Sequence, residues 1–300
     1  MEHTPDLSVL ALLSNQMADA VEQAGAAVVL VNGRERLPAT GVVFDTDLVL
    51  TADHVLERDE DITIETASGT ILAARLVGRD PTSDLAVLRV DGLGIAPATQ
   101  GTARVGQIVL AVGRPASGGA MASLGVVSAL SGPLRRRRGV AVEQVIQTDA
   151  TPYPGFSGGP LIDAQGAVLG ILTTGLVRST PLAIPTAVAW RIAGLLAQQG
   201  HMQRGYLGIA SQPIHLPVAQ RGGLTQERGL LLMRVEEGSP AEQGGLLLGD
   251  ILVSVNGQTI TDTDQLQAVL STSPVGTALE MGVLRGGAVQ QVVVTVGQRA

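Results

Sequence analysis

The spacing of hydrophobic residues along this chain changes twice. Between residues 7 and 24 the apolar positions recur at helical spacing, which predicts a short amphipathic helix. Short apolar runs follow, separated by glycine-rich turns, and such runs are typical of strands. The runs lie at 26–31, 41–44, 48–51, 62–65, 71–77, 86–90, 108–112, 123–130, 140–148, 159–162, 168–174 and 182–184. Many short strands with hardly a helix between them predict an antiparallel barrel or sandwich.

Helical spacing returns at 186–199 and is followed by a polar, glycine-containing stretch at 198–205, which is the predicted domain boundary. Beyond it the pattern indicates strands with two or three short helices. The clearest of these helices is predicted at 263–270, capped by Thr261 or Asp262. The predicted organisation has three parts: an N-terminal helical segment at 1–23, a barrel domain at 24–200 and an α+β domain at 205–300.

Composition narrows the class of protein and the chemistry. The 300 residues are 45% hydrophobic and 16% charged, as expected of a soluble globular protein with a large core. There is no Cys, which excludes disulfides, thiolate metal sites and cysteine nucleophiles. All 20 basic residues are Arg, and the lack of Lys excludes Schiff bases, a Walker A loop and a Ser/Lys dyad. The net charge of −7 argues against a general nucleic-acid-binding protein.

Two segments bear on partners and location. The run Arg135 to Arg138 is interpreted as a solvated loop, with a charge sensor or a contact for an acidic partner as the alternative. The first residues have no basic region, and their apolar stretch is too short for a signal peptide or a membrane helix. A cytoplasmic protein without a membrane segment is therefore predicted. Removal of an export or anchor segment would leave the same pattern, so a periplasmic or membrane-anchored protein stays open.

Three residues supply the groups of a serine hydrolase. Ser157 lies among glycines, His54 lies in Thr-Ala-Asp-His-Val, and Asp84 lies in Ser-Asp-Leu-Ala-Val. A serine hydroxyl needs a neighbouring base, and the base needs a third group to orient it. The backbone N–H groups of Gly155 and Ser157 are candidates for an oxyanion hole. The order His, Asp, Ser occurs in one serine-hydrolase architecture and predicts peptide-bond hydrolysis through an acyl-enzyme, without a metal or cofactor.

The stretch 155–159 also fits Gly-x-Ser-x-Gly, the nucleophile elbow of α/β-hydrolases. That motif requires a helix after the serine, with Asp and His further along the chain. Here the residues after Ser157 indicate a hairpin, and His201 and His215 fall in the linker and the second domain. The pattern therefore favours the barrel architecture. His3, His201 and His215 are predicted to be surface residues.

Segments 51–55, 83–88 and 147–161 resemble the HtrA/Deg family of serine proteases, which have a chymotrypsin-like double β-barrel. The resemblance covers about residues 24 to 200. It implies that His54 is the base, Asp84 its orienting group and Ser157 the nucleophile, and that Gly155 and Ser157 form the oxyanion hole. It also implies a preference for medium aliphatic side chains in unfolded substrates, and no Asp or Glu lies at 151–153 to favour Arg or Lys.

Two positions depart from the family pattern. Phe156 stands where the family usually has Asn, immediately before the serine. A backbone N–H does not depend on the side chain, so catalysis should survive while the packing changes. Asp53 stands where the family usually has Ala, immediately before the histidine. Its carboxylate would affect His54 if it pointed inward, although a strand neighbour more often points the other way.

The second domain resembles a PDZ domain. Residues 204–209 resemble its carboxylate-binding loop, and residues 235–257 resemble its core. By resemblance a peptide C-terminus pairs with the strand after Tyr206, and its carboxylate binds the N–H groups of Leu207, Gly208 and Ile209. Leu266 and Leu270 would wall a side-chain pocket. The family also implies a homotrimer, and it implies a role for Arg135 to Arg138 in coupling this domain to the protease.

The sequence therefore favours an ATP-independent serine endopeptidase that cleaves unfolded or misfolded proteins and binds C-terminal peptides. The main alternative is a catalytically silent PDZ-containing scaffold or chaperone. A third interpretation is an esterase.

Overall fold

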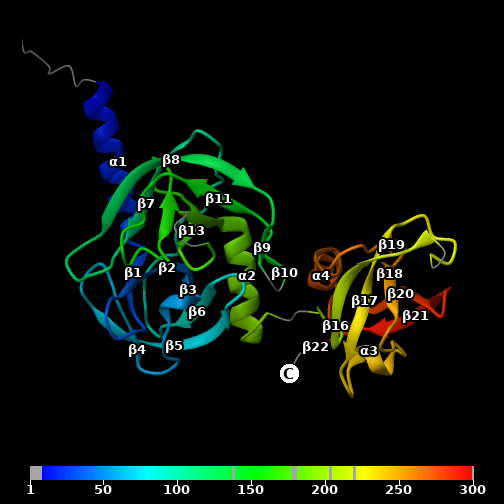
Figure 1. The fold of residues 1–300 in the computed structure, drawn as a ribbon. Coiled ribbons are helices and arrows are strands. Elements are labelled where there is room, and N and C mark those ends of the chain that lie inside the picture. Colours follow the sequence, from blue (N-terminus) through cyan, green and yellow to red (C-terminus); the bar gives the residue numbers. More distant parts are fainter. Residues whose placement is uncertain (1–8, 137–138, 178–180, 203–204, 219–220, 299–300) are drawn as a thin grey trace, which may run out of the picture. The chain divides into compact units, whose positions relative to one another are not determined.

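The computed structural model describes residues 9–136, 139–177, 181–202, 205–218 and 221–298 (Figure 1). The chain divides into two compact units, one formed mainly by residues up to 202 and the other by the residues that follow. This division falls within the polar stretch in which we predict the boundary, and the predicted domain limits themselves stay predictions. The first residues of the helix predicted at 7–24 lie outside the described residues, and so does His3.

Within the described residues, the first unit contains two closed antiparallel barrels, as predicted. The first barrel has the strand order β1-β2-β3-β6-β5-β4 and the second has β11-β14-β13-β12-β7-β8. The strands of the first are β1 (Val28–Asn32), β2 (Ala39–Asp45), β3 (Leu48–Ala52), β4 (Ile62–Glu65), β5 (Ile71–Asp80) and β6 (Leu85–Arg89). Those of the second are β7 (Ile108–Gly113), β8 (Met121–Ser131), β11 (Val145–Thr148), β12 (Pro160–Ile162), β13 (Val168–Thr173) and β14 (Leu182–Pro185).

The strands that face the junction of the barrels are buried on both sides. On β2 and β3, Val43 and Val49 pack inside the first barrel. Their chain neighbours Val42 and Leu50 point the other way, because successive side chains of a strand alternate, and join a cluster with residues of the second barrel. This double burial explains why the sequence here shows continuous apolar runs.

The predicted strand 140–148 is wrong as a single element. It is two strands, β10 (Gly139–Val142) and β11, separated by two residues. β11 pairs with β8 and β14 in the barrel, whereas β10 pairs with β9 (Leu134–Arg136), which the sequence did not predict. One straight strand cannot join both sheets, so the chain breaks at exposed Glu143, which forms an ion pair with Arg191 at 2.7 Å.

Two helices pack on the barrels. Helix α1 (Val9–Gly25) lies against β1 and β7, and helix α2 (Thr186–Gln199) covers β5, β6, β13 and β14. α2 ends where Gly200 adopts a φ of 77°, a value that suits glycine. Trp190 of α2 meets Phe44 of β2 edge to face, with ring centroids 6.1 Å apart. Among the helices that the structure describes, none is long and apolar enough to span a membrane.

The second unit is a sheet with the order β16-β17-β18-β20-β21, to which β19 is added beside β18. Its elements are β15 (Gly205–Tyr206), β16 (Ile209–His215), β17 (Arg228–Val235), α3 (Pro240–Gln243), β18 (Ile251–Val255), β19 (Gln258–Thr259), α4 (Thr263–Thr272), β20 (Ala278–Arg285), β21 (Ala288–Thr295) and β22 (Gly297–Gln298). Of the two predicted caps, Asp262 is the one at the N-cap of α4, where it accepts the N–H of Gln265 at 2.9 Å. The predicted α+β class is confirmed.

A partly buried ion pair joins the residue before β18 to the end of β20. Asp250, whose side chain is 2% exposed, accepts hydrogen bonds from Arg285 at 2.6 and 2.7 Å. Burial, the strongest single influence on Asp250, would raise the pKa of its carboxyl. The bonds from Arg285 and from the Leu247 N–H outweigh burial, so the pKa is lowered.

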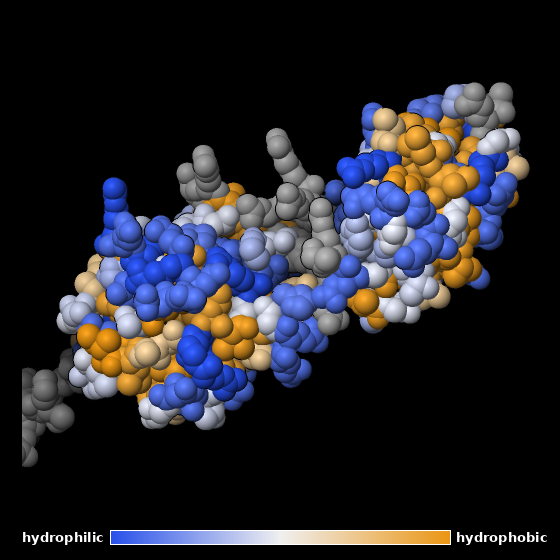
Figure 2. All heavy atoms as spheres, turned by 90° about the horizontal axis from the view of Figure 1, so that it is seen from below, coloured by the Kyte–Doolittle hydropathy of each residue, from blue (hydrophilic) through white to orange (hydrophobic). Residues whose placement is uncertain are grey.

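Apolar side chains also remain on the surface of both units, and Figure 2 shows them in orange among hydrophilic residues on the face that it presents. The most exposed are Val9, Leu10, Val218 and Leu248. Scattered exposed apolar residues are normal in soluble proteins, so we do not infer a binding partner from these residues.

Gly113→Ala should destabilise the second barrel. A Cβ at Gly113 would lie 2.4 Å from the ring of Phe156, which is fully buried. Forcing such a contact typically costs about 1–3 kcal/mol. Urea unfolding should show this loss, whereas Gly132→Ala, whose Cβ would meet open space, should leave the unfolding free energy unchanged. Equal stability of the two variants would contradict the packing described.

Candidate active site and peptide groove

Asp84 occupies a tight turn and forms hydrogen bonds with the segment that carries His54. Its φ is 59°, a left-handed value that is uncommon for a residue other than glycine. Its carbonyl accepts the N–H of Asp53 at 3.1 Å, and its Oδ1 accepts the N–H of His54 at 2.9 Å. The turn is therefore fixed against the short helix η1 (Asp53–Val55) by backbone contacts as well as by side chains. Strained backbone of this kind is a recurrent feature of functional sites.

The imidazole of His54 is oriented by the same carboxylate. Nδ1 lies 2.9 Å from Oδ1 and 2.8 Å from Oδ2 of Asp84. A proton on Nδ1 leaves the other ring nitrogen, Nε2, as an acceptor, which is the tautomer of a general base. The side chain of Asp84 is 4% exposed and that of His54 is 33% exposed. The pair is therefore anchored inside the protein and open on the histidine side.

The end of β13 completes the surroundings of the pair. The hydroxyl of Thr173 donates a hydrogen bond to Oδ2 of Asp84, and Oγ1 of Thr173 in turn accepts the N–H of Gly175 at 3.0 Å. A Cβ on Gly175 would lie 2.5 Å from Oδ2 of Asp84 and 2.7 Å from Nδ1 of His54. Only glycine therefore permits this close approach of backbone to the carboxylate and ring.

Ser157 lies in the turn before β12 and is 8% exposed. Its Oγ lies 3.2 Å from the hydroxyl of Thr174, the residue between Thr173 and Gly175. The hydrogen bonds of the described residues do not include one between Ser157 and His54. Catalytic hydrogen bonds are often long or poorly aligned without substrate, so this observation does not exclude the triad. The end of β13 thus contacts both Asp84 and the candidate nucleophile Ser157, whose hydroxyl is bonded to a neighbouring hydroxyl.

The predicted oxyanion-hole residues form a sharply bent loop. Gly155 has a φ of 88°, and a Cβ there would lie 2.4 Å from Pro115. The N–H groups of Gly155 and Ser157 donate to no protein group among the described residues. Such unengaged donors close to a nucleophile are what an oxyanion hole requires.

Phe156, where the family usually has Asn, is a core residue. It is fully buried among residues of the second barrel. Its ring lies over Gly113 and meets Tyr153 edge to face, with centroids 5.5 Å apart. Apolar packing therefore anchors the loop between the two candidate oxyanion donors.

Asp53 does not interact with His54 through its side chain. Arg79 donates a hydrogen bond from Nε to Oδ1 of Asp53 at 2.5 Å and binds Asp59 at 2.7 Å. Burial raises the pKa of the Asp53 carboxyl, and the bond from Arg79 offsets only part of this effect. The extra carboxylate is thus committed to Arg79, as expected for a side chain that points away from the site.

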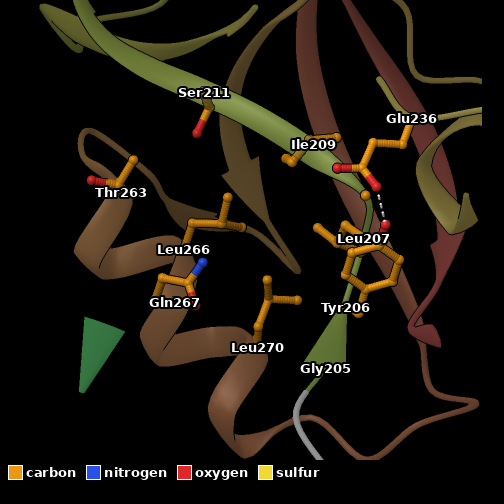
Figure 3. Close-up of a pocket in the computed structure, with 11 residues that line it drawn as sticks. Gly205, Tyr206, Leu207, Ile209, Ser211, Glu236, Thr263, Leu266, Gln267 and Leu270 are labelled. Carbon is orange, nitrogen blue, oxygen red and sulfur yellow. Dashed lines mark hydrogen bonds between the residues drawn. The ribbon is translucent and has the colours of Figure 1, made fainter. Parts of the chain in front are cut away.

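The second unit contains a groove between β16 and α4 (Figure 3). The predicted residues Tyr206, Leu207, Gly208 and Ile209 all line it, as do Leu266 and Leu270. The N–H groups of Leu207 and Gly208 donate to no protein group among the described residues. Because β16 is the terminal strand of its sheet, its outer edge is placed to accept another strand.

Glu236 fixes the loop 206–208 at the end of this groove by two hydrogen bonds. Tyr206 donates a hydrogen bond to Glu236 at 2.5 Å, and the N–H of Glu236 donates to the carbonyl of Gly208 at 2.8 Å. Gly208 has a φ of 79°, and a Cβ there would lie 2.2 Å from Ser239. The loop is therefore preorganised, and two of the residues with which it lines the groove, Leu207 and Gly208, have unengaged N–H groups.

Comparisons with known proteins agree with this geometry. Residues 39–171 match the family described as "Trypsin-like peptidase domain", and residues 232–285 match "PDZ domain". The structure of the "HtrA-type protease AlgW with tripeptide" is 31% identical, covers 95% of this chain and 97% of its own, and superposes with a TM-score of 0.75. The serine endoprotease from Yersinia pestis is 30% identical with a TM-score of 0.76, covering 95% of this chain and 98% of its own.

The chain belongs to the HtrA family of trypsin-like serine proteases with a PDZ domain. Among curated relatives, the "Probable periplasmic serine endoprotease DegP-like" of Pseudomonas savastanoi pv. phaseolicola is 35% identical over 267 residues, or 86% of this chain. The match covers 55% of that protein, so the chain spans about half the length of the curated relatives it matches.

In this HtrA-type chain, sequence reasoning missed several residues at the site. Thr173 and Thr174 contact the predicted triad, and Arg79 neutralises Asp53. A polar pair directly after the apolar run 168–172 was the available signal, but its partners lie 89 residues away for Thr173 and 17 residues away for Thr174. Exposed His201 and His215 are surface residues, as predicted. Because Arg137 and Arg138 and the side chains of Arg135 and Arg136 lie outside the described residues, the predicted role of that run stays a prediction.

Thr173→Val should lower kcat by roughly tenfold with little change in KM. The change removes one hydrogen bond to the buried Asp84 carboxylate, and such a bond to a charged group contributes about 1.5 kcal/mol. Peptide hydrolysis kinetics would measure the effect, and Thr173→Ser, which keeps the hydroxyl, should retain activity. A valine variant with the wild-type kcat would show that this hydroxyl does not support Asp84.

Proposed function

We propose that this protein is an ATP-independent serine endopeptidase that cleaves unfolded or misfolded proteins, with Ser157 as nucleophile, His54 as base and Asp84 as the group that orients it. The observation that carries the proposal is that the carboxylate of Asp84 binds both the backbone N–H and the ring Nδ1 of His54, at 2.8–2.9 Å. The position of Ser157 beside Thr174 and the unengaged N–H groups of Gly155 and Ser157 support it.

In the proposed reaction, Ser157 exchanges its bond to Thr174 for one to Nε2 of His54. As Oγ attacks the substrate carbonyl, His54 takes the hydroxyl proton and Asp84 stabilises the resulting imidazolium. The negative oxygen of the tetrahedral intermediate binds the N–H groups of Gly155 and Ser157. His54 then protonates the leaving amine, and a water molecule activated by the same base releases the acyl group from Ser157.

The substrate class follows from the family and from one feature of the loop before Ser157. Residues 151–153 carry no acidic side chain, so nothing in them favours Arg or Lys at the cleaved bond. We propose that medium aliphatic side chains are preferred there.

We further propose that the groove of the second unit binds the C-terminus of a peptide as an added strand on β16. The carboxylate binds at the N–H groups of Leu207, Gly208 and Ile209, and the last side chain enters the pocket beside Leu266 and Leu270. The solved HtrA-type protease AlgW is described with a decapeptide and with a tripeptide, which supports a peptide as the ligand class here.

The second candidate is a catalytically silent peptide-binding scaffold. One observation favours it, namely that Ser157 is bonded to Thr174 rather than to His54. We propose the protease because Asp84 orients the His54 ring as a general base requires, and because the chain belongs to a family of serine proteases. The esterase interpretation stays a prediction.

Location and assembly are also proposals. The Pseudomonas relative is described as periplasmic, and on that likeness we propose the periplasm over the cytoplasm. We propose a homotrimer on the family resemblance alone.

Ser157→Ala should abolish cleavage of fluorescent unfolded casein, with a loss of at least about 1,000-fold, because no other group replaces the nucleophile. A fluorophosphonate probe should label the wild type and not the variant. Ser68→Ala, at an exposed turn, is the matched control and should remain active. A wild type that neither cleaves casein nor reacts with the probe would support the scaffold, and turnover of small esters alone would support the esterase.

A labelled peptide ending in a free valine carboxylate should bind the protein, and the same peptide with a C-terminal amide should bind at least about tenfold more weakly. The amide removes the charge that the Leu207 and Gly208 N–H groups are placed to receive, and hydrogen bonds to charged groups contribute about 1.5–3 kcal/mol. Fluorescence anisotropy would compare the two. Equal affinities would rule out recognition of the terminal carboxylate.

A further inference from the structure

Thr40 lies on β2 of the first barrel, yet its hydrogen bonds reach the loop of the second barrel that carries Ser157. It is fully buried. Its hydroxyl donates to the carbonyl of Gly155 at 2.7 Å, and its N–H donates to the carbonyl of Ser157 at 3.3 Å. One residue therefore holds the carbonyls of both candidate oxyanion-hole residues.

These contacts fix the peptide planes on either side of the Ser157 N–H. The 155–156 peptide is held by Thr40 at its carbonyl and by the carbonyl of Tyr153, at 3.0 Å, at its N–H. The 157–158 peptide is held by Thr40 at its carbonyl and by the carbonyl of Leu172, at 2.9 Å, at its N–H. The 156–157 peptide between them has its carbonyl bonded to the N–H of Gly159 at 2.8 Å. Of the six polar groups of these three peptides, the Ser157 N–H alone has no protein partner among the described residues.

The hydroxyl of Thr40 is itself oriented. Its Oγ1 accepts the N–H of Arg114 at 2.9 Å, so its own proton is directed to the Gly155 carbonyl. The carbonyl of Thr40 accepts the hydroxyl of Thr51 at 2.7 Å, which fixes the residue from the other side. Within the described residues, the hydrogen bond from the Thr40 hydroxyl is the one that the Gly155 carbonyl accepts.

Packing against Thr40 explains the glycine after the serine. A Cβ on Gly158 would lie 2.2 Å from the carbonyl oxygen of Thr40, and the φ of Gly158 is 85°. The loop is thus pressed directly onto the backbone of β2. The contact is too close for any other residue, so the hydrogen bonds of Thr40 act on a loop that has no room to shift.

We propose that Thr40 is a positioning residue that holds the oxyanion hole in its working geometry across the junction of the two barrels. The inference rests on the proposed serine-peptidase function. Because the oxyanion forms only after attack, loss of the Thr40 hydroxyl should slow the chemical step and leave substrate binding intact.

The test compares kcat and KM for an internally quenched peptide with valine before the cleaved bond. Thr40→Val keeps the shape of the side chain and removes the hydroxyl. It should lower kcat by about 10- to 100-fold, since loss of a whole oxyanion donor costs about 100- to 1,000-fold, and KM should change by less than about twofold. The inhibition constant of a valine-peptide boronic acid, which places an oxygen in the hole, should rise by a factor similar to the loss in kcat. Thr40→Ser should restore kcat.

Thr186→Val is the matched control, because Thr186 is 2% exposed and its hydroxyl donates to the carbonyl of Val168 at 2.7 Å, remote from the site. It should keep the wild-type kcat. If thermal unfolding shows that Thr40→Val is not folded, Thr40→Ala takes its place with the same expected kcat loss.

An active wild type with an unimpaired Thr40→Val, or a Thr40→Ser variant as impaired as the valine variant, would overturn this inference alone. A wild type without hydrolysis that depends on Ser157 would overturn the proposed function and this inference with it.

Discussion

The candidate active site depends on the packing of the two barrels against each other. Val42 and Leu50 of the first barrel share one buried cluster with Ile162 and Ile171 of the second. This apolar contact is not directional, but it brings together polar groups that come from different barrels. If it loosened, the site would lose its geometry before either barrel lost its own hydrogen-bonded strands, since those bonds lie within each barrel.

Directional bonds at the edge of this contact then set the geometry. Asp84 receives donors from the His54 backbone, the His54 ring and the Thr173 hydroxyl. A buried carboxylate is costly unless its oxygens are satisfied, and here the donors come from both barrels. Thr40 also makes hydrogen bonds across the junction. It lies in the first barrel and donates to the carbonyls of Gly155 and Ser157 in the second. The two sets of bonds cross the junction on either side of the candidate nucleophile.

The low aromatic content of the chain gives its few rings particular structural weight. Phe156 fills the second barrel beneath the oxyanion loop, and its ring fits because Gly113 has no side chain. Phe156 thus anchors the loop by apolar burial. Anchoring by burial is less directional, which makes the hydrogen bonds from Thr40 more important for the final orientation of the N–H groups.

The sequence alone determined the architecture and the chemical groups. Apolar period and glycine-rich turns predicted an antiparallel barrel or sandwich followed by a second domain of strands and short helices. The residue types of three short motifs predicted the candidates His54, Asp84 and Ser157, and the family that these motifs resemble implied the double barrel. The same local signals could not predict the break at Glu143, because it depends on which strands β10 and β11 pair with. Nor could they predict Thr40, Thr173 or Arg79. Each of these acts on groups far away in the chain, and only tertiary packing, which places a hydroxyl or guanidinium within 3 Å or so of a distant carbonyl or carboxylate, decides such contacts.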